Sequence, residues 1–307
     1  MKNRARTNST RPATESADAR FADLDAWPPA TVLEMLWEQQ ASAVDAVRPA
    51  LRPLAAACHA AAARLASGKG RLVYTGAGTS GRIAAQDGAE LGPTFGWPAA
   101  RVLLLPAGGA EALVRAVENA EDDEKSAADT VSRNAIAAPD VVLAVAASGT
   151  TPYTVTFLEA ARRAGALTIA IANSPGTPLL RAAEFPVLVE TGPEALAGST
   201  RLKAGTAQKV VLNLFSTLLM ILLNHVYRGR MVDLEITNAK LRRRAILIVA
   251  ELSGATEEES TILLARAQGS VKRALVLARG LAPEAADLLL ARHGGDLRAA
   301  LASLDPA

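Results

Sequence analysis

Five short apolar runs that alternate with helical stretches constrain the fold of this chain more than any other feature of its sequence. Each run has the length of a β-strand, and turn-forming residues or a helical pattern separate it from the next. The runs are Leu72–Tyr74, Val102–Leu105, Val141–Ala146, Thr168–Ala172 and Pro186–Val189. Because strand, helix and strand in this order form right-handed crossovers, the sequence predicts an α/β fold: a doubly wound, five-stranded parallel sheet flanked by helices.

Helical patterns precede and follow the predicted sheet. In Ala30–Ser67 the apolar residues recur every three or four positions, and Pro53 predicts a boundary between two lead-in helices. A second helical pattern extends from Ser199 to about Glu251, and Gly254 is suited to end it.

A separate C-terminal module is indicated from Thr256 onward. Thr256 and Glu259 have the spacing of a capping box, and glycines at 269, 280, 294 and 295 leave room for three or four short amphipathic helices. We interpret His293 as a structural residue at a helix end.

These patterns together predict three parts of the chain. We expect a flexible N-terminus at 1–23, a main domain with its helical lead-in at 24–252, and a small helical bundle at 253–307.

Charge and cysteine content exclude several classes of protein. With 33 Lys and Arg against 31 Asp and Glu the net charge is +2, so no strong field marks the chain for nucleic acid or a membrane surface. The single cysteine, Cys58, excludes internal disulfides and a cysteine-based metal cluster. With three histidines, the chain has few ligands for any other kind of metal site.

The N-terminal segment Met1–Arg20 is polar, which is unlike a secretory signal or a membrane anchor, and we expect a cytoplasmic protein. Val210–Val226 is the one long apolar segment, about 17 residues, and Asn213 and Asn224 are among the polar residues that interrupt it. It is short for a membrane span, so it predicts a buried core helix or a helix at a dimer interface.

Two loops rich in glycine and hydroxyl groups follow strands of the predicted sheet. Thr75–Arg82 and Ala146–Pro152 each join a strand to a helix, where backbone N–H groups, a positive helix end and hydroxyls can bind an anion. Both lie at the carboxyl edge, where doubly wound sheets bind ligands. The predicted phosphate-binding residues are Gly78, Thr79, Ser80, Ser148, Gly149, Thr150 and Thr151.

Other phosphate-binding motifs fit the first loop less well. Its glycines spell GxGxxG, but the acidic residue of a dinucleotide site is absent, since Val102–Leu105 runs into Pro106. Arg82 and Ile83 stand where a nucleotide triphosphate loop has Lys and Ser or Thr. A compact phosphomonoester therefore fits better, and the remaining alternative is that both loops are plain turns capped by Thr and Ser.

Longer segments resemble a known family. The paired Ser/Thr loops resemble the sugar isomerase (SIS) fold, and the similarity to the N-acetylmuramic acid 6-phosphate etherases extends from about Leu24 to the C-terminus. The segments that carry it are Gly76–Arg82, Asp87–Phe95, Ala116–Asp122, Ala147–Tyr153 and Gly198–Lys209, with further support from Thr237–Leu241 and His293–Gly295.

The resemblance implies a cytoplasmic carbon–oxygen lyase of peptidoglycan amino-sugar recycling. Such an enzyme removes D-lactate from N-acetylmuramic acid 6-phosphate by elimination, then adds water to give N-acetylglucosamine 6-phosphate, and needs neither metal nor cofactor. The match places the proton donor at Glu90 and the second catalytic glutamate, which we assign as base, at Glu121. The Ala, Gly and Leu residues around Glu90 predict that it is buried and that burial raises its pKa.

The positive charges of Arg201 and Lys203 make them candidate contacts for the phosphate or the lactyl carboxylate. The alternative is that they form a basic helix start that pairs with Glu194 or faces solvent. Where the family usually has Ser-Glu-Cys-Pro around the donor, this chain has Ala89-Glu90-Leu91-Gly92, a change that bears on the tuning of the acid and on substrate fit.

Helix geometry adds an expectation about assembly. A helix that continued from Ser80 to Glu90 would separate the two by about 15 Å, more than one monosaccharide spans. Either this helix ends early, as Gly88 and Gly92 permit, or Glu90 serves the phosphate loops of a neighbouring subunit. We expect the second arrangement, a homodimer with a composite site. The competing functions are a non-catalytic SIS sensor of sugar phosphates and a sugar phosphate isomerase.

Overall fold

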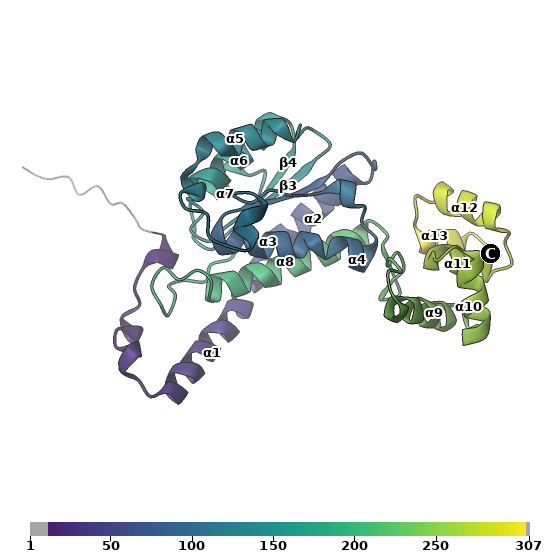
Figure 1. Ribbon diagram of the computed structural model, residues 1–307, viewed down its shortest axis with the longest axis horizontal. Coiled ribbons are helices and arrows are strands. Elements are labelled where there is room, and N and C mark those ends of the chain that lie inside the picture. The colour runs from purple at the N-terminus through teal and green to yellow at the C-terminus, as the bar shows by residue number, and fades with distance from the viewer. Residues whose placement is uncertain (1–11, 305–307) are drawn as a thin grey trace, which may run out of the picture. The chain divides into compact units, whose positions relative to one another are not determined.

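The computed structural model describes residues 12–304 and has the α/β architecture that the sequence predicts (Figure 1). Its main sheet has five strands, all parallel, in the order β2-β1-β3-β4-β5. The strands are β1 (Leu72–Gly76), β2 (Val102–Leu104), β3 (Val141–Ala146), β4 (Leu167–Ala172) and β5 (Phe185–Leu188). The predicted runs match these strands to within two residues at each end.

Helices cover both faces of the sheet, as Figure 1 shows. One face carries α5 (Glu124–Arg133), α6 (Pro152–Arg163) and α7 (Pro178–Ala182), and Phe157 and Leu158 of α6 are fully buried against it. The other face carries α2 (Leu51–Leu65), α3 (Gly78–Ala89) and α8 (Lys203–Leu222). There the thiol of Cys58 donates a hydrogen bond to the carbonyl oxygen of Phe215, and burial raises its pKa to about 12.

The lead-in helices are α1 (Pro29–Asp45) and α2, separated by a short 3₁₀ turn, η4 (Arg48–Ala50). The predicted boundary at Pro53 is wrong. Pro53 lies in the first turn of α2, where backbone N–H groups have no partner within the helix, so a residue without an N–H is tolerated.

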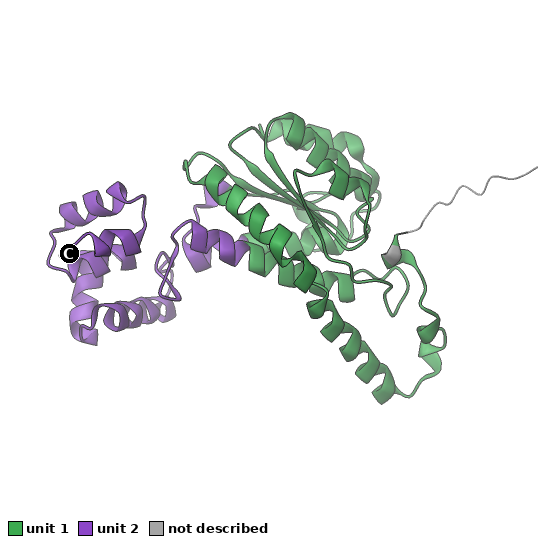
Figure 2. Cartoon of the chain, turned by 180° about the vertical axis from the view of Figure 1, so that it is seen from behind, with its two compact units in different colours: residues 1–88, 102–215 green, residues 89–101, 216–307 purple. Residues whose placement is uncertain are grey.

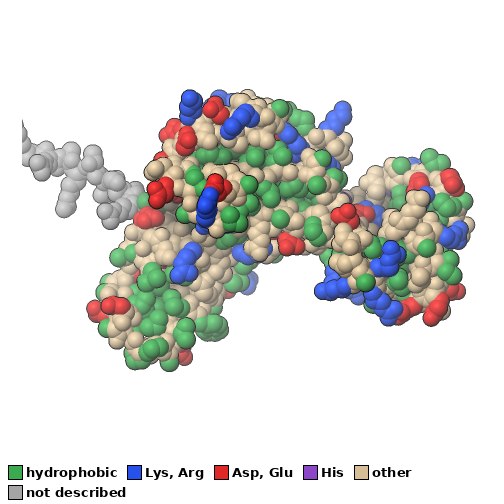
Figure 3. Space-filling view, viewed as in Figure 1, with side chains coloured by type: hydrophobic (Ala, Val, Ile, Leu, Met, Phe, Trp, Pro, Cys, Tyr) green, Lys and Arg blue, Asp and Glu red, His purple; other side chains and the backbone are tan. Residues whose placement is uncertain are grey.

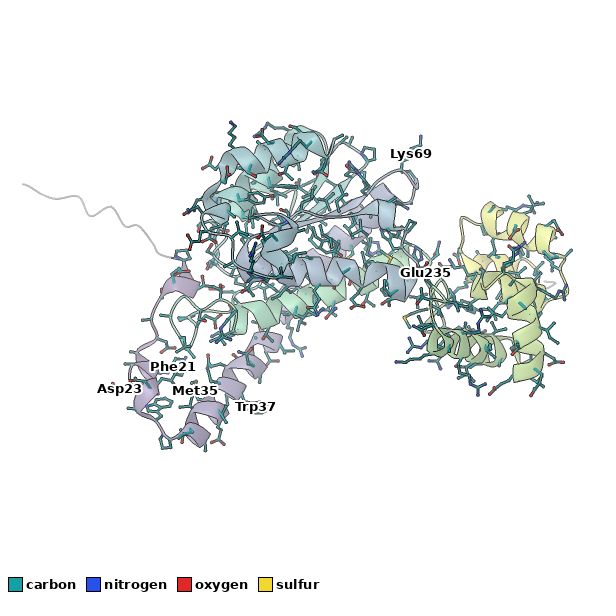
Figure 4. All side chains as sticks on the ribbon, in the orientation of Figure 1. Phe21, Asp23, Met35, Trp37, Lys69 and Glu235 are labelled. Atoms are coloured by element: carbon teal, nitrogen blue, oxygen red, sulfur yellow. The ribbon has the colours of Figure 1, made fainter. Side chains whose placement is uncertain are left out.

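The segment before α1 was predicted to be flexible over 1–23, of which 1–11 lie outside the described residues. From residue 12 onward it forms three 3₁₀ turns, η1 (Ala13–Glu15), η2 (Ala19–Phe21) and η3 (Leu24–Ala26). Phe21 and Leu24 pack against Met35 of α1 in a small hydrophobic core, and Figure 4 shows Phe21 and Met35 between the turns and the helix. This packing orders the segment.

The chain divides into two compact units, coloured in Figure 2. Unit 1 comprises 1–88 and 102–215, and unit 2 comprises 89–101 and 216–307. These limits differ from the predicted domain boundaries because residues of the 216–252 stretch, such as Ile248 and Val249, share one hydrophobic core with Leu264 and Leu275 of the C-terminal helices.

The expected helical run from Ser199 to Glu251 is interrupted. After α8 ends at Leu222, a two-stranded hairpin follows, and its turn residues Arg228 and Gly229 both have positive φ, which a helix cannot accommodate. The elements of unit 2 that precede its C-terminal module are α4 (Leu91–Phe95), η5 (Ala99–Arg101), β6 (Val226–Tyr227), β7 (Arg230–Met231) and α9 (Ala239–Ser253). Gly254 ends α9 in the left-handed conformation, as predicted.

The C-terminal module contains four short helices, α10 (Glu257–Arg266), α11 (Val271–Leu277), α12 (Pro283–Arg292) and α13 (Leu297–Ala302). Thr256 and Glu259 form the predicted capping box at the start of α10, each side chain accepting a hydrogen bond from the other's backbone N–H. His293 is the C-cap residue of α12, in agreement with its predicted structural role.

Within the described residues, α8 is the helix whose length and apolar content suffice to cross a membrane. Half of that apolar segment, 50%, is buried inside the protein, and Val211, Leu212 and Phe215 have no exposed surface. A core helix of a soluble protein has these properties.

Candidate functional site

The first glycine-rich loop joins β1 to α3, which begins at Gly78. Gly76 and Gly81 lie so close that a β-carbon on Gly81 would stand 2.6 Å from the carbonyl oxygen of Gly76. Only glycine permits this approach, which turns the chain sharply and brings Thr79 and Ser80 to the positive end of a twelve-residue helix. The turn therefore aims its hydroxyls and N–H groups at the carboxyl edge of the sheet.

The second loop joins β3 to α6 and has a related construction. Thr150 donates hydrogen bonds to the Ser148 hydroxyl from its backbone N–H (3.2 Å) and from its own hydroxyl (3.1 Å). Gly149 has a φ of +66°, and a β-carbon there would stand 2.3 Å from Oγ1 of Thr177. Pro152 is the first residue of α6, as predicted, and its fixed φ suits that position.

Both loops line one cavity of about 430 Å³. Of the predicted phosphate-binding residues, all but Gly149 line it: Gly78, Thr79, Ser80, Ser148, Thr150 and Thr151. Two long helices, α3 and α6, begin at this cavity, so their partial positive charges and free N–H groups favour an anion there. The structure thus brings the two predicted loops together at one cavity, and phosphate binding there stays a prediction.

Three acidic residues also line this cavity: Glu15, Glu121 and Asp122. Glu121 and Asp122 belong to the short turn η7 (Ala120–Asp122), which follows η6 (Ala110–Leu113) in the connection between β2 and α5. Asn119 precedes η7 in the left-handed conformation, and Asp123 caps α5 by accepting a hydrogen bond from the Ser126 N–H at 2.8 Å. The turn therefore presents carboxylates beside the two glycine-rich loops.

Glu90 lies elsewhere, immediately after α3, which continues unbroken to Ala89. Its side chain is exposed and is not among those that line the cavity. The predicted burial of Glu90 is therefore wrong for a single chain, because Ala89 beside it is exposed too and supplies no cover. The possibility that α3 ends before Ala89 is also excluded.

Arg201 and Lys203 do not line the cavity either. Arg201 is exposed, whereas Lys203 is buried and its Nζ donates to Oε1 of Gln39 at 3.1 Å. Burial lowers the pKa of Lys203. The buried carboxylate of Glu194 accepts hydrogen bonds from the backbone N–H groups of Lys203 and Ala204, so it caps α8. This arrangement is close to the alternative prediction of a basic helix start paired with Glu194.

Outside the two loops and the turn that carries Glu121, sequence reasoning missed four described residues of the cavity wall: Pro12, Glu15, Gly198 and Thr200. Gly198 donates its N–H to the carbonyl oxygen of Thr14, and that bond places the N-terminal turn against the loop before α8. Thr14 is completely buried. Gly198 and Thr200 lie in a segment that resembles the etherases, so the sequence did point to this segment. Nothing in the local pattern indicated that the segment contacts residues 12–15.

A second cavity, of about 320 Å³, adjoins the first and shares Ala77, Gly78, Thr79 and Glu121 with it. The rest of its wall consists of Arg82, Ala107, Ala112, Ala116, Val117, Glu118, Asn119 and Ala120. Over residues 12–304, no group of His, Cys, Asp and Glu side chains is arranged to hold a metal ion.

Comparisons with known proteins agree with this architecture. Residues 54–162 match the model of the N-terminal SIS domain of glucokinase regulatory protein, and 115–218 match the SIS domain model. Among solved structures, a phosphoheptose isomerase from Francisella tularensis superimposes with a TM-score of 0.50 at 18% identity, covering 64% of this chain and 100% of that one. At this identity the likeness concerns the fold.

Two curated relatives cover nearly the whole chain. An N-acetylmuramic acid 6-phosphate etherase from Deinococcus radiodurans is 48% identical over 289 residues, which are 94% of this chain and 94% of the relative. An enzyme of the same name from Cronobacter sakazakii is 45% identical, covering 94% of this chain and 97% of its own. The predicted resemblance is confirmed, and the chain belongs to the N-acetylmuramic acid 6-phosphate etherase family.

Proposed function

We propose that this chain is a carbon–oxygen lyase that cleaves the lactyl ether of N-acetylmuramic acid 6-phosphate in the cytoplasm, as a step of peptidoglycan recycling. D-Lactate leaves by elimination across the C2–C3 bond of the ring-opened sugar, and water then adds at C3. The products are D-lactate and N-acetylglucosamine 6-phosphate. Neither step changes the oxidation state of the protein, and neither calls for a cofactor.

The observation that carries the proposal is that Glu121 shares one cavity with both phosphate loops. A phosphate held by Ser80 and Ser148 tethers the substrate, and a carboxylate in the same cavity removes the proton from C2. A protein that only binds sugar phosphates has no need of that carboxylate. This is the reason for preferring an enzyme to a sensor, although one matching SIS model comes from a regulatory protein.

Glu90 is the proposed proton donor to the departing lactate oxygen, and it serves the cavity of a partner subunit. Its position after the twelve residues of α3 puts it about 15 Å along the helix from Ser80, farther than one sugar reaches. Its exposure in the single chain is what a residue contributed to a partner would show.

An apolar stripe on α1 supports a homodimer. Leu33, Trp37 and Val44 are 68%, 70% and 51% exposed, and their spacing of four and seven residues places them along one side of the helix. Figure 4 shows Trp37 on the other side of α1 from Met35, and Figure 3 shows hydrophobic side chains gathered over this N-terminal region. Exposed apolar stripes of this kind typically mark interfaces.

The reaction is tested by incubating the protein with N-acetylmuramic acid 6-phosphate in water enriched in oxygen-18. Mass spectrometry should detect D-lactate and a sugar phosphate that carries the label at C3, and both signals should be lost in Glu90→Gln and Glu121→Gln. Saturable binding without lactate release would instead favour the sensor, and aldose–ketose interconversion would favour the isomerase.

Subunit sharing is tested by mixing two inactive variants, Glu90→Gln and Ser80→Ala. If Glu90 serves the partner's cavity, the mixed dimer has one cavity with both defects and one with neither, and it should regain up to half of the native activity per dimer. A mixture that regains none, despite subunit exchange verified by native mass spectrometry, would contradict a shared site.

A further inference from the structure

We infer that the second cavity is the subsite for the lactyl group and that Arg82 binds its carboxylate. The inference rests on the proposed function, and it assigns a specificity-determining residue to that site. Arg82 would distinguish the lactyl-bearing substrate from the same sugar phosphate without lactate.

The first step of the argument is the position of the cavity. It shares Thr79 with the phosphate cavity and has Glu121 on its wall, so the two cavities meet at the proposed base. The lactyl ether joins C3, which is bonded to the carbon that loses its proton. A substrate held by its phosphate in the first cavity therefore has its lactyl group beside Glu121, where the second cavity opens.

The second step is the size and character of the wall. Besides Arg82, Asn119 and the two glutamates, the side chains are mostly methyl groups, from Ala77, Ala107, Ala112, Ala116 and Ala120, with Val117. A β-carbon on Gly108 would stand 2.9 Å from Cβ of Val117 and 3.2 Å from those of Ala112 and Ala120, so this glycine lets the segments that form the wall pack closely. A small apolar wall suits the methyl group of lactate.

The third step is the charge of Arg82. Among the described residues that line this wall, it is the one cation. It is half-buried, and its Nε donates to the carbonyl oxygen of Ala112 at 2.9 Å. No carboxylate of residues 12–304 lies within 4 Å of its guanidinium, although Glu118 and Glu121 line the same cavity. Its terminal Nη groups thus remain able to bind a carboxylate in a bidentate manner.

The candidates named by the sequence for this role, Arg201 and Lys203, line neither cavity. Arg82 follows the phosphate loop directly, and α3 holds it on the side that faces η6 through the bond to Ala112. The same helix therefore positions hydroxyls for the phosphate and a guanidinium for the lactyl carboxylate.

The experiment compares two ligands that differ in the lactyl group. Dissociation constants for N-acetylmuramic acid 6-phosphate and N-acetylglucosamine 6-phosphate are measured by calorimetry in a Glu121→Gln background, which stops turnover. Adding Arg82→Gln should weaken binding of the first ligand about 10- to 100-fold and leave binding of the second within twofold. Arg115→Gln, which removes an exposed arginine of the neighbouring segment, is the matched control and should change neither constant.

A second variant keeps the test valid if Arg82→Gln unfolds. Ala116→Leu adds bulk to an exposed position on the wall of the subsite, so it should leave the fold intact and show the same selective loss. Equal weakening of both ligands, or of neither, would overturn the subsite. If native protein releases D-lactate but the variants show no selectivity, the inference fails and the proposed function stands. If N-acetylmuramic acid 6-phosphate does not bind at all, both fail.

Discussion

Oε2 of Glu15 lies 3.1 Å from the position that a β-carbon on Gly198 would occupy, so an N-terminal turn meets the loop before α8 at the wall of the cavity that both glycine-rich loops line. These two residues are separated by most of unit 1 in the sequence. Their approach closes one side of the cavity with a carboxylate that faces the same space as Glu121.

The contact predicts that Gly198→Ala impairs substrate binding. Gly198 has a φ of +76°, so alanine there costs about 1 kcal/mol of folding free energy, and its methyl group also displaces Glu15. We expect a several-fold higher KM. Gly192→Ala is the matched control, because Gly192 has a φ of +68° but nothing within 4 Å of a β-carbon. It should lower the thermal midpoint by a similar amount without changing KM; equal KM values for the two variants would refute the prediction.

Glu121 and Asp122 both line the phosphate cavity, and the proposed mechanism separates their roles. Glu121→Gln removes the base and should lower kcat by about 10²- to 10⁴-fold. Asp122→Asn, which changes the adjacent carboxylate in the same way, should lower kcat less than tenfold. Steady-state assays of lactate release decide this, and a larger loss for Asp122→Asn would transfer the role of base to Asp122.

The hydrogen bonds that Asp140 accepts should make the folded protein less stable in acid. Burial alone would raise its pKa, but hydrogen bonds from the Arg71 guanidinium and backbone and from the Ala137 N–H outweigh burial and hold the pKa below its usual value. A carboxyl group with a lowered pKa stabilises the folded state fully above its unfolded pKa of about 3.9 and loses this contribution as the pH falls further. The free energy of unfolding should therefore decline below about pH 4.

Asp140→Asn should cost about 2–3 kcal/mol at neutral pH and make the remaining stability less dependent on acid. Urea unfolding at pH 7 and pH 3 measures both effects. Glu251→Gln is the control, because Glu251 pairs with Arg230 on the surface, where solvent screens the pair. An acid dependence in Asp140→Asn equal to that of the native protein would assign the effect to other carboxylates.

The apolar stripe on α1 predicts the assembly. Trp37→Glu places a charge at a position that is 70% exposed in the single chain and covered in the proposed dimer, so it should convert the protein to a monomer and abolish activity. Leu288→Glu introduces the same charge at an equally exposed site, 70%, on α12 and should change neither property. Analytical ultracentrifugation provides the readout, and a dimeric, active Trp37→Glu protein would exclude this interface.

The five-stranded parallel sheet and the two loops that meet at its carboxyl edge could be predicted from the sequence. These features are local, because a buried strand needs an uninterrupted apolar run and a sharp strand-to-helix turn needs glycines at particular positions. The capping box at Thr256 and the C-cap at Gly254 were predictable for the same reason.

The remaining features of the site could not be predicted from the sequence, because they depend on contacts between distant segments. Glu90 lies in an apolar sequence context yet is exposed, because burial depends on what packs against a helix end and not on its sequence neighbours. The approach of Glu15 to Gly198, and of Arg82 to Ala112, joins segments that no local pattern pairs. Such contacts arise when the fold brings distant segments to one edge of the sheet, and that placement is set by packing of the whole unit.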